Sequence, residues 1–324
     1  MKAVVFTEFG SSDKLHVADI PVPSPSANEV LVRVQAATID NVDILIRKGI
    51  YKTRLHRPAI TGRDLVGVVE KVGSDVNDFS PGQAVWTNSA GFDGRMGTTA
   101  EFVAVEAARL YPLPRSADPC KVVASVHAAC TAQMIVGEVM KLREGSCILI
   151  EGAAGNVGRK LVQCAHAVGA KVVATSSEKA FETLRALGAD RCFSYDEAGM
   201  QELSSDAHQL SIDHVLDTSG KVRLSKNLSL LALGGQLTII TPPPADTAFD
   251  ARQFYMRDLR IRGFVLSHAT CGQLAAAARQ LNRYYERGLL LEDPVEFHSF
   301  EDVPRLQARM ENHGAHGMKY VIRP

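Results

Sequence analysis

A glycine-rich turn near the middle of the chain carries the clearest chemical signal. The apolar run CILIEG, starting at Cys147, leads into AAGNVG and then into an amphipathic stretch. Glycine permits a sharp turn and the close approach of a pyrophosphate, and the N-terminus of the following helix offers unpaired N–H groups with a partial positive charge. The turn predicts a dinucleotide site formed by Gly152, Ala153, Gly155, Asn156, Val157 and Gly158. The match to G-x-G-x-x-G is imperfect because Ala153 holds the first glycine position, and a tight turn without a ligand is the alternative.

The end of the next expected strand indicates which dinucleotide binds. NAD sites usually place an acid there, hydrogen-bonded to the ribose hydroxyls. This strand ends instead at Thr175, with Ser176, Ser177 and Lys179 following. These groups could bind the 2′-phosphate of NADPH, which an acid would repel. Glu178 is a contrary residue, although an acid in the first turn of a helix also favours the dipole, and Lys179 could be a solvated surface charge. The sequence favours NADPH over NADH.

Ligands for a catalytic metal are not gathered in the sequence. A metal-dependent alcohol dehydrogenase needs Cys, His or carboxylate ligands around an open position. Arg63 stands beside Asp64 and would repel zinc, His127 is alone in its apolar stretch, and the six cysteines form no C-x-x-C pair. We therefore expect no metal. Without a Lewis acid, reduction of an electrophilic quinone or enone is easier than alcohol oxidation, because it needs mainly proximity and orientation of the reactants.

The secondary-structure elements that must position these residues follow two different patterns along the chain. To about residue 115, short strands and turns alternate, with strands expected at 2–6, 29–37, 64–73 and 83–87. This pattern fits an irregular β-barrel. From about residue 118, helices (121–139, 155–168, 178–187, 223–233) alternate with strands (146–150, 171–175, 212–216, 236–241, 260–266). Such alternation predicts an α/β, doubly wound parallel sheet.

The remainder of the chain is expected to return to the first domain. It contains a helix at 272–287, a strand near Val295 and a helix from Glu301. The predicted domains are therefore 1–117 with 267–324, and 118–266.

The bulk composition excludes some classes of partner. Thirty-six Lys and Arg residues balance thirty-six Asp and Glu residues, so the chain has no overall attraction to nucleic acid or to an anionic membrane. No apolar run reaches the ~18 residues needed to span a bilayer, and the start MKAVVFTEFG has no secretory pattern. We expect a soluble, cytoplasmic protein with reduced, structural cysteines.

Taken together, the motifs resemble the zeta-crystallin-like quinone oxidoreductases, the zinc-free branch of the medium-chain dehydrogenase/reductase superfamily. The resemblance runs essentially end to end through MKAVVFTEFG, EVLVRVQAATIDNVDILIRKGIY, GRDLVGVVEKVG, EGAAGNVG and LSLLALGGQLTII. It implies a GroES-like catalytic domain, a Rossmann domain and a cofactor in the cleft between them. It also implies a homodimer that pairs Rossmann edge strands, here residues 260–266.

The resemblance also implies roles for individual residues. Zinc enzymes of the superfamily carry cysteine where Asp40 stands and histidine where Arg63 stands, and both departures support a zinc-free site. Thr131 should approach the cofactor phosphates or the nicotinamide side, and Tyr195 the adenosine phosphate. The path from adenosine to nicotinamide should be lined by Ser219, Thr241, Phe264 and Val265. Lys319 lies near the family's C-terminal basic residue, shifted by one position.

The substrate pocket departs from the family pattern. The family has asparagine where Asp40 stands and commonly tyrosine where Leu45 stands; Asn41 is adjacent to the first position, and Tyr51 matches the family tyrosine. An aspartate in a dry cleft tends to have a raised pKa, so Asp40 could donate a proton after hydride transfer. The alternative is a carboxylate bonded to backbone or to Arg63. Tyr51 contacts substrate in one interpretation and only packs in the other.

Three functions remain open at this point. The first is hydride transfer from NADPH to a quinone or an activated enone. The second is reduction of 2-enoyl thioesters or alkenals. The third is a low-turnover NADPH-binding protein with a structural, regulatory or RNA-binding role, against which the neutral charge argues.

Overall fold

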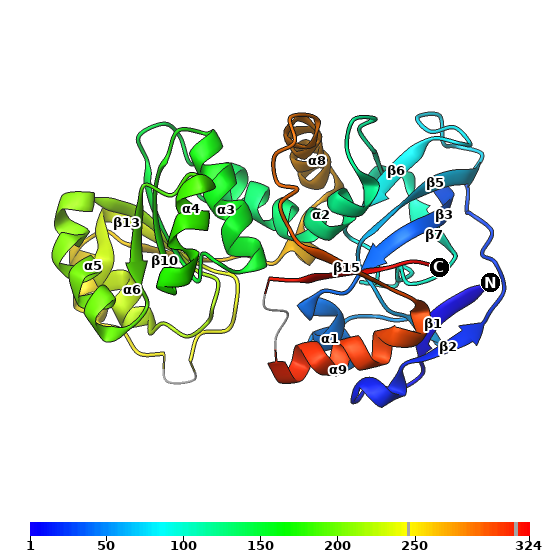
Figure 1. The fold of residues 1–324 in the computed structure, drawn as a ribbon, viewed down its shortest axis with the longest axis horizontal. Helices are drawn as coiled ribbons and strands as arrows, with labels where there is room; N and C mark the ends of the chain where they lie inside the picture. Colours follow the sequence, from blue (N-terminus) through cyan, green and yellow to red (C-terminus); the bar gives the residue numbers. More distant parts are fainter. Residues whose placement is uncertain (245–246, 314–316) are drawn as a thin grey trace. The chain divides into compact units, whose positions relative to one another are not determined.

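The computed structural model describes residues 1–244, 247–313 and 317–324 (Figure 1). The chain forms two compact units. The first comprises Met1–Cys130 and Ala269–Pro324, and the second comprises Thr131–His268. The division falls within helix α2 (Pro119–Met134). The domain limits expected from the sequence, 1–117 with 267–324 and 118–266, stay a prediction.

The first unit is built on two β-sheets. The larger has the order β15-β16-β3-β5-β6-β8, with β7 beside β3, and the smaller has the order β2-β1-β4. The strands of the larger sheet are β3 (Glu29–Thr38), β5 (Leu65–Val72), β6 (Ala84–Thr87), β7 (Phe102–Glu106), β8 (Tyr111–Pro112), β15 (Val295–His298) and β16 (Lys319–Ile322). Those of the smaller sheet are β1 (Lys2–Phe6), β2 (His16–Asp19) and β4 (Ala59–Ile60). In β3, Val30, Val32 and Val34 are buried in the core, as the alternation of its sequence requires.

The C-terminal segment, Ala269–Pro324, belongs to the first unit. After α8 (Cys271–Glu286) and α9 (Val303–His313), strand β16 pairs antiparallel with β3. Val321 lies opposite Thr38, and Ile322 lies opposite Ala37. This register carries the start of β16 past the end of β3, where the first candidate site residues lie.

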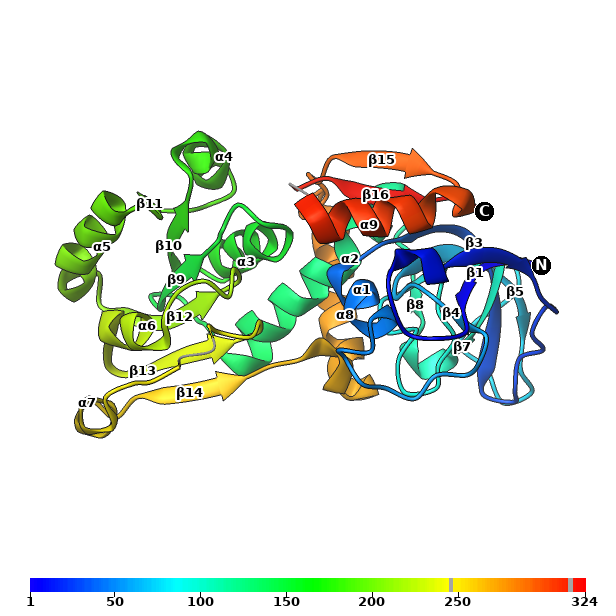
Figure 2. The ribbon, with the colours of Figure 1, turned by 90° about the horizontal axis from the view of Figure 1, so that it is seen from below.

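The second unit is the predicted doubly wound sheet. Six parallel strands follow the order β11-β10-β9-β12-β13-β14 (Figure 2). Counted from β9 along the chain this is the order 3-2-1-4-5-6 of dinucleotide-binding folds. The strands are β9 (Cys147–Glu151), β10 (Lys171–Ser176), β11 (Arg191–Ser194), β12 (Ile212–Asp217), β13 (Leu231–Ile239) and β14 (Arg260–Gly263). The helices are α3 (Asn156–Ala167), α4 (Phe181–Ala186), α5 (Glu197–Leu210), α6 (Leu224–Leu230) and α7 (Ala251–Met256).

One predicted boundary is wrong. The helix expected over 223–233 ends at Leu230, and β13 begins at Leu231. Leu231 pairs with Ile212, and the register then shifts before Gln236 pairs with His214. Gly234, with φ +74°, lies within that shift. Gly234 and Gly235 therefore form an irregularity inside the strand, whereas the helix expected over 223–233 would have ended just before them.

Helix α2 continues into a π-helical turn (Ile135–Val139). Contrary to the expectation from apolar runs, the 21 residues Pro119–Val139 are long and apolar enough to cross a membrane. However, 72% of the tested window is buried inside the protein. Burial of this extent is what the core helix of a folded unit shows, so the segment is weak evidence for a membrane span.

Candidate functional site

The first group of candidate residues lies where β3 passes into α1 (Asn41–Arg47). Asp40 precedes the helix in an extended conformation. The carboxylate of Asp43 accepts the Asp40 backbone N–H at 2.8 Å, so the chain that carries Asp40 is held in place. The sequence did not predict this short helix. Asn41, its first residue, is exposed, whereas Asp40 is buried.

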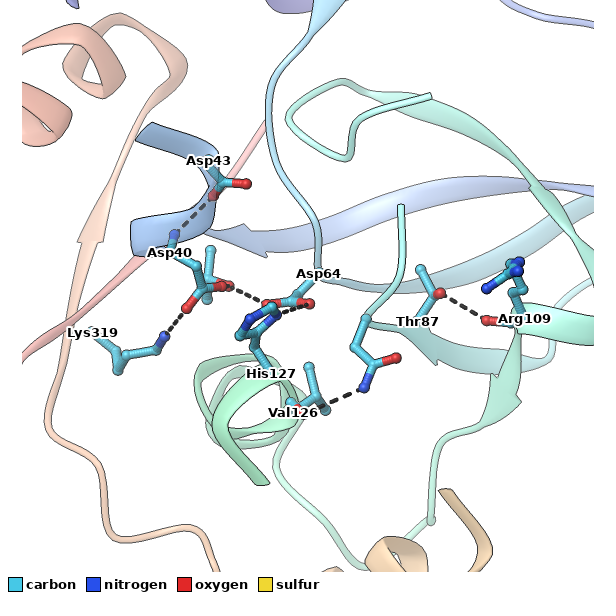
Figure 3. Close-up of polar contacts among 10 residues, drawn as sticks. Asp40, Asp43, Asp64, Thr87, Arg109, Val126, His127 and Lys319 are labelled. Carbon is cyan, nitrogen blue, oxygen red and sulfur yellow. Dashed lines mark hydrogen bonds and ion pairs between the residues drawn. The ribbon is translucent and has the colours of Figure 1, made fainter. Parts of the chain in front are cut away.

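Asp40 forms a buried ion pair with Lys319 (Figure 3). The Lys319 Nζ atom lies 2.6 Å from Asp40 Oδ1, and the two residues are 3% and 7% exposed. Burial by itself would raise the pKa of Asp40, but the ammonium of Lys319 outweighs it and holds the pKa well below its usual range. The expectation of a raised pKa at Asp40 is therefore wrong. Lys319, expected at the cofactor, has its ammonium bound to this carboxylate.

The carboxyl group whose pKa is raised is that of the neighbouring Asp64. The Thr38 hydroxyl lies 3.4 Å from a carboxyl oxygen of both Asp40 and Asp64. His127 Nδ1 lies 3.5 Å from Asp64 Oδ1. Burial, and then the negative charge of Asp40, raise the pKa of Asp64 well above its usual value. Burial lowers the pKa of His127. Within the cluster, Lys319 thus favours the ionised form of Asp40, whereas burial favours the protonated form of Asp64 and the neutral form of His127.

We define the charged cluster as Asp40, Asp64, His127 and Lys319. A second carboxyl group with a raised pKa and an aromatic pair adjoin it. Burial and the charge of Asp40 raise the pKa of Asp43 to about 8. Tyr51 stacks on Phe92, with ring centroids 5.4 Å apart. Its hydroxyl is buried and has no hydrogen-bond partner among the residues that the structure describes. An unsatisfied buried hydroxyl is costly, which fits a group that a ligand would engage.

Three side chains of the charged cluster are possible ligands for a metal ion. Ligand atoms of Asp40, Asp64 and His127 lie within 4.8 Å of one another and could hold a metal ion. The sequence reasoning treated His127 as isolated and missed this gathering, because three distant segments supply it. The donor set does not fit a divalent cation, however. Asp40 already binds the ammonium of Lys319 at 2.6 Å, and a metal there would meet that positive charge.

The second group of candidate residues lies in the glycine-rich turn of the second unit. Strand β9 is followed by Gly152 with φ +69°, and α3 begins at Asn156 with Gly155 as its N-cap. A Cβ atom on Gly158 would lie 2.6 Å from the carbonyl oxygen of Gly152. Helix α3 therefore packs against the turn only because residue 158 is glycine. Ala153 is fully buried, and Val157 lies in the first turn of α3.

The other predicted cofactor residues of this unit follow the carboxyl ends of the parallel strands. They are Ser176 and Ser177 at the end of β10, Lys179 just beyond, Tyr195 after β11, Ser219 after β12, Thr241 after β13, and Phe264 and Val265 after β14. This is the edge at which open α/β sheets bind ligands. The structure thus brings these residues to one edge, and their contact with a cofactor stays a prediction. Thr131 is buried in α2, and its contact with a cofactor also stays a prediction.

A buried acid beneath this edge was missed by the sequence reasoning. Glu151, the last residue of β9, is 1% exposed. Burial and the nearby Asp217 raise the pKa of Glu151 to about 8, while Asn227 opposes the shift. Asp217 is well bonded, since its carboxylate accepts the N–H and the hydroxyl of Ser219 at 2.7 and 2.6 Å.

Comparison with known proteins identifies the family. Residues 26–115 match the alcohol dehydrogenase GroES-like domain, and residues 156–280 match the zinc-binding dehydrogenase model. The chain is 30% identical to rat quinone oxidoreductase over 243 residues, covering 74% of this chain and 73% of that protein. It is 31% identical to a 2-methylene-furan-3-one reductase of Solanum lycopersicum, covering 100% and 79%.

Solved structures share the fold over the full length. An NAD-dependent alcohol dehydrogenase is 28% identical with a TM-score of 0.87, and the match covers 100% of both chains. The Escherichia coli quinone oxidoreductase complexed with NADPH also has a TM-score of 0.87 over both whole chains, at 21% identity, which shows the fold alone. The chain belongs to the medium-chain dehydrogenase/reductase superfamily, as an NAD(P)-dependent oxidoreductase with a GroES-like domain and a Rossmann domain.

Proposed function

We propose that the protein is a zinc-independent reductase that transfers a hydride from NADPH to a quinone or an activated enone. The observation that carries the proposal is the ion pair between Lys319 and Asp40. It places a cation of the chain itself among the side chains that could otherwise hold a metal. Without a Lewis acid the acceptor must already be electrophilic. Similarity to proteins named quinone oxidoreductase supports the same choice.

Groups for NADPH are available at the carboxyl edge of the Rossmann sheet. The N-terminus of α3 would receive the pyrophosphate, and Gly152 and Gly158 leave the main chain free of side chains there. Ser176, Ser177 and Lys179 would bind the 2′-phosphate. NADPH supplies the hydride when bound. Tyr51, with its unsatisfied hydroxyl, would hydrogen-bond to the acceptor.

A side chain can store the proton that reduction consumes. Asp40 is unsuited because Lys319 keeps it ionised. Burial and the charge of Asp40 raise the pKa of Asp64 and so favour its protonated form, and Asp64 lies 3.5 Å from His127 Nδ1. We therefore assign the proton store to Asp64, with His127 as its neighbour. Asn41 and Thr131, expected at the reaction site, lie outside the charged cluster, and their roles stay proposals.

Alkenal and enone reduction is the second candidate. The tomato reductase matches over the whole chain, and an NADPH-dependent alkenal/one oxidoreductase of Arabidopsis thaliana is 33% identical over 249 residues. Both names describe reduction of an activated double bond. This chemistry needs the same hydride and proton as quinone reduction, so the acceptor alone distinguishes the two functions.

Assembly and location complete the proposal. Strand β14 ends the order of the Rossmann sheet, which leaves an edge for pairing with a second copy. We propose a homodimer, from the family resemblance, and a cytoplasmic location, from the reduced cysteines and the sequence of the N-terminal segment; light scattering of the purified protein tests the dimer. A low-turnover structural, regulatory or RNA-binding role is the alternative of another class, and salt-dependent RNA retention without NADPH consumption would favour it.

The decisive experiment follows NADPH and NADH absorbance with purified, EDTA-treated protein. The acceptors are a panel of quinones, enones, alkenals and enoyl-CoA thioesters. We expect NADPH-selective turnover of a quinone or an enone that EDTA does not reduce. Lys179→Gln should raise the KM for NADPH about tenfold and leave the KM for NADH unchanged. Lys171→Gln, at the opposite end of β10, is the matched control. Loss of activity with EDTA and its recovery with zinc would refute the proposal.

A further inference from the structure

A pocket in the first unit lies outside both groups of candidate residues. Its volume is about 670 Å³, within the usual size of small-ligand sites. The loop after β6, strand β7 and the segment around Leu55 line it. The proposed function does not use this pocket.

Three arginines line the pocket, and two of them are paired with acids. Arg54 Nε lies 3.0 Å from Asp93, and Arg109 Nε lies 3.0 Å from Glu106. The third lining carboxylate, Glu29, accepts a backbone N–H at 2.9 Å. The lining acids are therefore all engaged, which leaves the third arginine to consider.

That arginine, Arg95, is fixed in place by a hydrogen bond to the main chain, and Glu106 and Asp93 act on it only from beyond ion-pair distance. Its Nε donates to the carbonyl oxygen of Ser89 at 2.8 Å. Its NH2 group is buried and finds no hydrogen-bond partner within the described part of the chain. Burial, and then the nearby guanidinium of Arg109, lower the pKa of Arg95 to about 10. The side chain thus stays charged at neutral pH beside a like charge, an arrangement that a bound anion would stabilise.

The rest of the lining indicates the kind of anion. Leu55, Met96 and Val105 give the pocket apolar walls, and among the described residues no carboxylate forms an ion pair with Arg95. We propose that this pocket binds a small organic monoanion, whose carboxylate pairs with Arg95 while its apolar body packs on these walls.

The pocket and the site for the reaction share one aromatic ring. Arg95 lies over the ring of Phe92, with its Cζ atom 5.6 Å from the centroid. Arg63 lies 5.5 Å from the same centroid, and Tyr51 stacks on that ring. A ligand held by Arg95 would therefore bind next to the ring that supports the proposed substrate tyrosine.

Titration calorimetry on the whole chain tests the proposal, with sodium benzoate as the probe at fixed ionic strength. We expect saturable one-to-one binding to the wild type, and binding about tenfold weaker or more for Arg95→Gln, because a charge-assisted hydrogen bond is lost. Arg305→Gln, an exposed residue paired with Asp302 and outside the lining of the pocket, should bind benzoate like the wild type. The affinity should not change with saturating NADPH, and it can be measured whether or not the protein reduces any acceptor.

Three results would overturn the inference. They are no saturable benzoate binding to the wild type, equal binding by Arg95→Gln, or tighter binding of inorganic phosphate than of benzoate. Cooperative thermal unfolding of Arg95→Gln checks that this variant folds. If it does not fold, Arg109→Gln serves in its place, and it should also weaken benzoate binding because its guanidinium adjoins that of Arg95.

Discussion

Replacing Glu151 by glutamine should change how the stability of the protein depends on pH. The pKa of Glu151 is raised to about 8 in the folded chain, against 4.5 for an unperturbed glutamate. A raised pKa means that the folded state retains a proton which the unfolded state has lost. The stability that this proton contributes is fully present below about pH 4.5 and is lost as the pH rises through about 8. Glutamine has a similar shape and stays neutral at every pH.

The size of the effect follows from the shift in pKa. Each pKa unit corresponds to about 1.4 kcal/mol, so the whole shift sets an upper limit of about 5 kcal/mol. Between pH 6 and pH 9 the folded group passes from protonated to ionised. Over that interval the free energy of unfolding of the wild type should fall by about 3 kcal/mol through this group, and that of Glu151→Gln should not. Relative to the wild type, the variant should therefore be more stable at pH 9 than at pH 6 by this amount.

Urea unfolding followed by circular dichroism at pH 6 and pH 9 measures this gap. Glu202→Gln is the matched control because Glu202 is exposed on α5 of the same unit. The control should keep the pH dependence of the wild type. If Glu151→Gln also kept it, the buried carboxyl would not be protonated near neutral pH, and the reasoning from its burial would fail.

Three further predictions concern the cluster and the glycine-rich turn. Lys319→Met should destabilise the protein by about 3–5 kcal/mol in urea unfolding because it leaves Asp40 buried and unpaired; adding Asp40→Asn should restore most of the loss, and additive costs would argue against the ion pair. Gly158→Ala should abolish NADPH binding by calorimetry, since its Cβ would lie 2.6 Å from a carbonyl oxygen, whereas Gly272→Ala, with open space around it, should bind normally. Asp64→Asn should remove from the pH profile of kcat the fall at high pH that marks loss of the stored proton; an unchanged profile would exclude Asp64 as the proton store.

The sequence predicted those features that local patterns specify. The alternation of strands and helices led to the parallel sheet, and the glycines at 152, 155 and 158 marked the turn before α3. The partner of Asp40 could not be predicted in this way, because Lys319 is separated from Asp40 by 279 positions in the sequence. The two residues meet only because β16 pairs with β3. The expectation for the pKa of Asp40 considered burial and omitted this cation. The boundary near Leu231 was missed because glycine ends helices more often than it lies inside strands.

The pairing of β16 with β3 also has a consequence for synthesis of the chain. Asp40 and Asp64 leave the ribosome early, and the whole Rossmann unit follows before Lys319 is made. Until then the acidic end of β3 has no ammonium to neutralise it, and closing this core would bury an uncompensated charge. The nascent first unit should therefore remain incompletely folded while the second unit folds. It should complete its core only when β16 has been synthesised and pairs with β3.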